Sequence, residues 1–148
     1  MARPKSYREL IVWQKAMALA RQVYILSEAL PKQEAYGLVS QIRRAAVSVA
    51  SNIAEGYGRL TDLQFRHFLG NARGSLYEMQ TQLELAASLN FLDKETERQL
   101  MDQASEVARL INGLLAKLRQ TASPASTAKP INPASTANPA NPADTYVS

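Results

Sequence analysis

The sequence contains no cysteine and only one histidine, His67. Without cysteine there are no disulfides and no thiolate metal sites. A single histidine cannot supply the Glu-x-x-His pairs of a di-iron bundle site, and a lone histidine is more often solvated or at an interface than catalytic. There is also no glycine-rich phosphate loop and no nucleophile paired with a base. We therefore expect a protein that is not an enzyme, with no catalytic residue, no metal and no cofactor.

Long apolar runs are missing as well. The longest uncharged stretch before residue 121 covers residues 45–54, which is too short to span a bilayer. No apolar run precedes Leu10, so the chain starts without the pattern of a secretory signal. We expect a cytoplasmic protein that does not contact membranes.

Bulky side chains are scarce after residue 120. Residues 121–148 consist mainly of Pro, Ala, Ser, Thr and Asn, and the run Pro-Ala-Ser-Thr-Ala at Pro124 recurs at Pro133. Such a segment cannot bury enough apolar surface to offset the entropy of ordering it. We expect a folded domain in residues 1–120 and a disordered, polyproline-like tail in residues 121–148. A tail that binds a partner is the less favoured alternative.

Residues 1–120 contain four segments in which apolar residues recur at helical spacing, and no segment alternates as a strand would. The segments cover about residues 6–30, 36–57, 61–88 and 93–120. The third starts at Thr61, which forms a capping box with Gln64, and the fourth follows the N-cap residue Asp93. The pattern predicts an all-α protein: an antiparallel up-down-up-down four-helix bundle with a disordered C-terminal tail.

The first segment carries an apolar stripe with the only tryptophan of the chain. We expect this stripe to face the core, because tryptophan at helical spacing is more often a core residue than a stacking platform for a base. The stripe is Leu10, Trp13, Met17, Ala20 and Tyr24, and Val23 and Leu26 widen it.

The second segment is small or apolar over about two thirds of its circumference, which is typical of a helix with neighbours on two sides. Glycines Gly56 and Gly58 are expected to end it in the left-handed conformation of a helix C-cap. The broad arc is Leu38, Ile42, Ala45, Ala46, Val49, Ala50 and Ile53. The narrow polar stripe opposite is Gln41, Arg44, Ser48, Asn52 and Glu55.

Two further features suggest contact surfaces. In the third segment, Gly70 and Gly74 each cost about 1 kcal/mol relative to alanine, which points either to a close helix crossing or to a surface that a partner approaches. The net charge of +4 lies in residues 1–120, and residues 37–75 hold five arginines but no lysine. These side chains either form ion pairs or bind phosphate through their planar forks. The five arginines are Arg43, Arg44, Arg59, Arg66 and Arg73.

The chain resembles a bacterial family of four-helix bundle proteins that includes the protein encoded in intervening sequences of 23S ribosomal RNA genes. The resemblance spans about residues 7–119 and rests on several runs. These are Leu10-Ile-Val-Trp-Gln14, Tyr36-Gly-Leu38, Gln41-Ile-Arg-Arg-Ala-Ala-Val-Ser48, Ser51-Asn-Ile-Ala-Glu-Gly56, Phe68-Leu69, Gly74-Ser75 and Glu78 through Leu85. It implies a homopentameric ring of antiparallel bundles. The chain is also similar to the accessory protein of diversity-generating retroelements, a basic pentamer that binds nucleic acid and a reverse transcriptase.

Two functions follow as hypotheses. The first is a non-enzymatic ring that binds RNA or DNA weakly through the five arginines. The second is a scaffold or adaptor that binds another protein and no nucleic acid. In either case the polar stripe of the second helix, together with Gly70 and Gly74, is expected to form the subunit interface.

Overall fold

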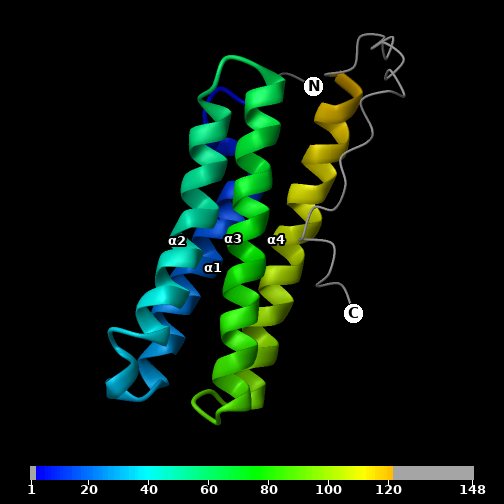
Figure 1. Cartoon of the computed structure of the whole chain (residues 1–148). Helices are drawn as coiled ribbons and strands as arrows, with labels where there is room; N and C mark the ends of the chain where they lie inside the picture. Colours follow the sequence, from blue (N-terminus) through cyan, green and yellow to red (C-terminus); the bar gives the residue numbers. More distant parts are fainter. Residues whose placement is uncertain (1–2, 122–148) are drawn as a thin grey trace, which may run out of the picture.

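The structure is a computed structural model that describes residues 3–121 as a bundle of four long helices (Figure 1). They are α1 (Ile11–Leu26), α2 (Leu38–Tyr57), α3 (Asp62–Ser88) and α4 (Lys94–Thr121). The colour gradient in Figure 1 shows that successive helices run in opposite directions, and α1 also packs against α4 to close the bundle. The predicted four-helix fold is confirmed. Apart from Thr121, which ends α4, the predicted tail lies outside the described residues.

Helices α3 and α4 begin where their capping residues predict. The Thr61 hydroxyl accepts the backbone N–H of Gln64 at 3.1 Å, and the Asp93 carboxylate accepts that of Thr96 at 2.7 Å. The same backbone N–H is the main cause that lowers the pKa of Asp93, because it stabilises the ionised carboxylate. Helix α2 begins at Leu38, two residues later than expected, where the carboxylate of Glu34 accepts the Leu38 N–H at 3.1 Å.

The first helix is shorter than predicted. A single 3₁₀ turn, η1 (Tyr7–Glu9), precedes α1, and Leu10 between them is extended with ψ of 121°. At the other end α1 is followed by two further 3₁₀ turns, η2 (Ser27–Ala29) and η3 (Lys32–Glu34). The hydroxyl of Tyr57 donates to the carbonyl of Pro4, which ties the segment before η1 to the end of α2.

The core confirms the apolar stripes of α2, α3 and α4 and corrects that of α1. Part of the predicted α1 stripe is confirmed, since Leu10, Ala20 and Val23 are buried. The buried face is rotated away from the rest of the stripe, so Trp13 is only partly buried while Met17 and Tyr24 are each 45% exposed. Both α1 faces have three-and-four spacing, so periodicity alone did not distinguish them. The residues that α1 buries are Val12, Ala16, Leu19, Ala20 and Val23.

Gly56 allows α2 and α3 to approach closely where α2 ends. A Cβ atom on Gly56 would lie 2.5 Å from the Cβ of Phe68 and 3.0 Å from a ring carbon of Phe65. Neither Gly56 nor Gly58 has a positive φ; Gly58, the C-cap, has φ of −77°. The expected left-handed cap is therefore wrong, and at Gly56 it is the missing side chain that matters.

None of the helices in residues 3–121 is long and apolar enough to cross a membrane. In the same part of the chain, no three histidine, aspartate or glutamate side chains are grouped so that they could hold a metal ion.

Candidate functional site

The five arginines predicted as a binding surface fall into separate environments. Arg43 holds the end of α1: its Nε donates to the Ser27 hydroxyl at 2.9 Å, its Nη2 donates to the Tyr24 carbonyl at 3.1 Å, and its guanidinium lies over the Tyr24 ring. Its Nη2 is also 3.8 Å from a carboxylate oxygen of Glu28. These contacts give Arg43 a structural role.

Arg59 and Arg44 are likewise outside the hollow that holds Arg66 and Arg73, and Arg44 shares a hollow with Arg43. Arg59 pairs with Glu55 at 2.9 Å and lies over the ring of Phe68. Arg44 is exposed on α2, in a shallow hollow that Tyr36 and Val47 also line. We therefore do not place Arg43, Arg44 and Arg59 in one site with the remaining two arginines.

Arg66 and Arg73 are brought together, and α4 adds a third arginine. They are seven residues apart, so they share a face of α3. Arg73 donates through Nη1 to the Asn112 side-chain oxygen on α4 at 3.0 Å. The two helices are antiparallel, so the chain positions that follow Asn112 on α4 lie opposite those that precede Arg73 on α3. Arg66 is seven residues before Arg73 and Arg119 is seven residues after Asn112, which places these two arginines near each other.

We call this region the arginine groove. It is a hollow of about 310 Å³ on the outer surface between α3 and α4. Its described lining includes no carboxylate; Asp62, one turn before Arg66 on α3, lies outside that lining. Its lining residues are Arg66, Gly70, Arg73, Asn112, Leu115, Ala116 and Arg119.

The arginine groove is suited to bind an anion. Three guanidinium groups in a hollow that is lined by no carboxylate create a positive potential that a phosphate or carboxylate would neutralise. The Nε of Arg66 is buried and has no hydrogen-bond partner in the described chain, so one donor at this site is unsatisfied. Guanidinium groups bind phosphate oxygens through two parallel N–H donors, which fixes geometry as well as charge.

The polar stripe of α2 is divided by the structure. Ser48 exchanges a hydrogen bond with Ser75 of α3 at 2.8 Å, and the Asn52 amide donates to the Ser48 carbonyl at 2.8 Å. These two side chains join α2 to α3 or stay within α2. Gln41, Arg44 and Glu55 are exposed, so they remain candidates for a subunit interface.

Gly70 and Gly74 do not mark a helix crossing inside the bundle. An added Cβ atom on either residue would have no neighbour within 4 Å. The interpretation as close packing within the chain is therefore wrong. The alternative, a surface that a partner chain or a phosphate backbone approaches, stays a prediction.

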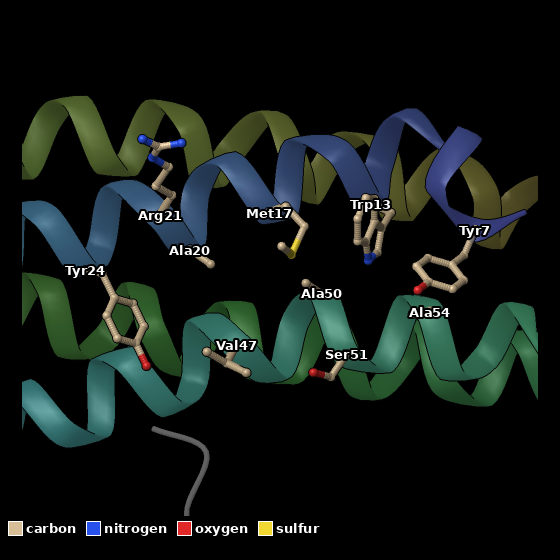
Figure 2. A pocket seen from close by; sticks show the side chains of 10 residues that line it. All are labelled: Tyr7, Trp13, Met17, Ala20, Arg21, Tyr24, Val47, Ala50, Ser51 and Ala54. Atoms are coloured by element: carbon tan, nitrogen blue, oxygen red, sulfur yellow. The ribbon is translucent and has the colours of Figure 1, made fainter.

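A second hollow lies between α1 and α2 (Figure 2). The apolar stripe that α1 leaves outside the core forms one side, with Tyr7, Trp13, Met17 and Tyr24, and α2 forms the other. The hollow has a volume of about 400 Å³ and is mainly apolar. We call it the aromatic groove.

Comparison with known proteins agrees with this class of bundle. The family model of the 23S rRNA-intervening sequence protein matches residues 8–113, and the chain belongs to this family. A solved structure of a protein with unknown function, from the S23 ribosomal protein family of Bacteroides thetaiotaomicron, is similar with a TM-score of 0.67 and 22% identity. The match covers 71% of this chain and 98% of that chain, and supports the fold. No curated protein matches the sequence.

Proposed function

We propose that this protein is a non-enzymatic homo-oligomer, a pentameric ring of four-helix bundles, that binds the phosphate backbone of RNA or DNA. The observation that carries nucleic-acid binding is the arginine groove. Arg66, Arg73 and Arg119 converge there from two helices, and Asn112 holds the Arg73 guanidinium in place. A phosphodiester supplies the negative oxygens that these donors lack.

The lining of the groove favours recognition of the backbone over recognition of bases. None of the described residues that line it is aromatic, so it offers no ring on which a base could stack. Contacts to phosphate position a protein on nucleic acid without reading sequence. We expect binding that depends little on sequence and falls steeply with salt.

The oligomeric part of the proposal is supported by the resemblance to pentameric relatives and by the open surface of α3. Gly74 is exposed with free space above it, so a helix of another subunit can approach the backbone there. A closed ring would repeat the arginine groove once per subunit. Several weak sites on one strand bind more tightly together than any one alone.

A second function, a protein-binding scaffold without nucleic acid, is favoured by the aromatic groove. Met17 and Tyr24 are each 45% exposed there, and Val47 is 44% exposed. Exposed apolar residues that adjoin in one groove are typical of a surface that another chain covers.

Binding to a mixed pool of RNA and DNA, at low and at physiological salt, tests the proposal when the mass of the protein is measured in parallel. Salt-sensitive binding by a particle of five subunits is the expected result. No binding at low salt would overturn the nucleic-acid proposal and leave the scaffold. A monomeric mass would overturn the ring and leave the arginine groove to be tested alone.

A further inference from the structure

The aromatic groove has the lining of a polyproline-binding site. Tyr7 and Trp13 meet edge to face, with ring centroids 5.1 Å apart and an angle of 70°. Figure 2 shows both rings over the gap between α1 and α2, where the α2 side is formed by small residues such as Ala50 and Ala54. Tyr24 adds a third ring at the other end.

Such grooves bind polyproline II segments for two physical reasons. Proline rings pack on flat aromatic rings, and the carbonyls of a polyproline II helix have no internal partner, so they accept hydrogen bonds from Tyr and Trp donors. In this groove the Tyr7 hydroxyl and the Trp13 indole N–H donate no hydrogen bond within residues 3–121. Both donors are available to a bound chain.

We propose that the segment after α4, residues 122–148, occupies the aromatic groove as a polyproline II helix. All its prolines are separated by three or six residues. A polyproline II helix has three residues per turn, so these prolines would line one face of it. They are Pro124, Pro130, Pro133, Pro139 and Pro142.

The repeat of the segment also matches the groove in length. Residues 124–132 and 133–141 are two versions of one nine-residue repeat that starts Pro-Ala-Ser-Thr-Ala. Nine residues of polyproline II extend about 28 Å at about 3.1 Å each. Helix α1, which forms one side of the groove, has 16 residues and is therefore about 24 Å long. One repeat is enough to cover the groove.

The segment starts at the right end of the bundle. Helix α4 ends at the end of the bundle where the N-terminus lies (Figure 1), and Tyr7 and Trp13 belong to η1 and the first turn of α1. Since α4 packs against α1 and helices pack about 8–10 Å apart, the path from Thr121 to the groove is about 20 Å. Residues 122–132 reach about 34 Å in the polyproline II form, so the second repeat can enter the groove of its own chain.

Docking of this segment has a functional consequence. The segment lies on the same chain, so its effective concentration at the groove is on the order of millimolar, and a weak contact is enough to keep the groove covered. A protein partner that binds this apolar surface would have to displace it. The segment would act as a built-in competitor for the aromatic groove, independently of the arginine groove.

The sole tryptophan makes the proposal measurable in the full chain, because Trp13 lies in the groove. Quenching of its fluorescence by acrylamide reports its exposure. The test variant changes Pro130, Pro133 and Pro139 to serine. The matched control changes Ala128, Ala134 and Ala140 to serine, which leaves the proline face intact.

The expected result is a rise of about twofold in the quenching constant of the proline variant and no rise in the control, as for a groove occupied in more than half of the molecules. A synthetic peptide of residues 132–142, added to the proline variant, should restore the shielding. Equal quenching in all three proteins would overturn the proposal. If Trp13 becomes equally exposed to acrylamide in all three proteins when the protein is diluted, the groove is covered by a second copy of the chain. That result would also overturn the proposal.

Discussion

Replacing Gly56 with alanine should destabilise the bundle, although alanine is the better helix former. Gly56 is buried in the last turns of α2. A Cβ atom there would lie 2.5 Å from the Cβ of Phe68, which is bonded directly to the α3 backbone. Rotation of the Phe68 side chain cannot relieve this contact. The two helices would have to separate, which loosens the packing on both sides.

The magnitude follows from two opposing terms. Alanine gains about 1 kcal/mol over glycine in a helix interior. Overpacking a tight contact costs about 1–3 kcal/mol, and a contact fixed to the backbone belongs at the upper end. We expect Gly56→Ala to lower the free energy of unfolding by about 1–2 kcal/mol, which corresponds to a fall in Tm of about 5 °C for a domain of this size.

Gly113→Ala is the matched control, since an added Cβ atom on Gly113 of α4 meets nothing within 4 Å. It should stabilise the bundle by up to about 1 kcal/mol. Urea unfolding followed by far-ultraviolet circular dichroism, at one fixed protein concentration, measures both variants. Stabilisation by Gly56→Ala, or equal shifts in both variants, would refute the close approach of α2 and α3.

Three further predictions concern single side chains. Arg43→Gln should lower the free energy of unfolding by about 1–2 kcal/mol, because it removes the donors that hold the end of α1, and should leave nucleic-acid binding unchanged in the same preparation. Thr61→Ala should cost about 1 kcal/mol in a denaturant titration and Thr61→Ser far less, since only serine keeps the capping hydroxyl. The lowered pKa of Asp93 means that its ionised form stabilises the fold above pH about 4, and that this contribution is lost as pH falls through the folded pKa. Asp93→Asn keeps a capping side chain, so the stability of this variant relative to the wild type should rise on acidification; a constant difference would contradict the role of the charge.

Much of the fold was predictable because α2, α3 and α4 each carry one dominant apolar face, and α3 and α4 also have clear capping residues. Helix α1 was not, because it has two apolar faces. Its large residues Trp13, Met17 and Tyr24 favoured a face that is only partly the buried one. The core takes Ala20 and Val23 of that stripe but also the smaller Val12 and Ala16 beside it. Which face a helix buries depends on its neighbours, and single-segment periodicity does not contain that information.

The candidate site was predictable only in part. The spacing of Arg66 and Arg73 placed them on one face of α3. Arg119 was missed because its approach depends on the antiparallel register of α3 and α4, which Arg73 and Asn112 now fix. The sequence did not reveal that Arg43 is held within its own chain, because its partners Tyr24 and Ser27 near the end of α1 are distant from it in the sequence. Arg43 was therefore grouped with the binding arginines.

The central claim, that the arginine groove binds the nucleic-acid backbone, is tested most directly by the salt dependence of binding to a labelled single-stranded RNA. The groove variant changes Arg66, Arg73 and Arg119 to glutamine. The control changes three exposed arginines outside the groove to glutamine and so has the same net charge; these are Arg8, Arg21 and Arg109.

The account predicts that the groove variant loses affinity and that the slope of log K against log salt becomes shallower by about 2, since each phosphate contact to a single strand contributes about 0.7. The control should keep nearly the wild-type slope. Equal losses in both variants would show that binding follows net charge alone, and an unchanged groove variant would show that the site lies elsewhere; either result would contradict the account.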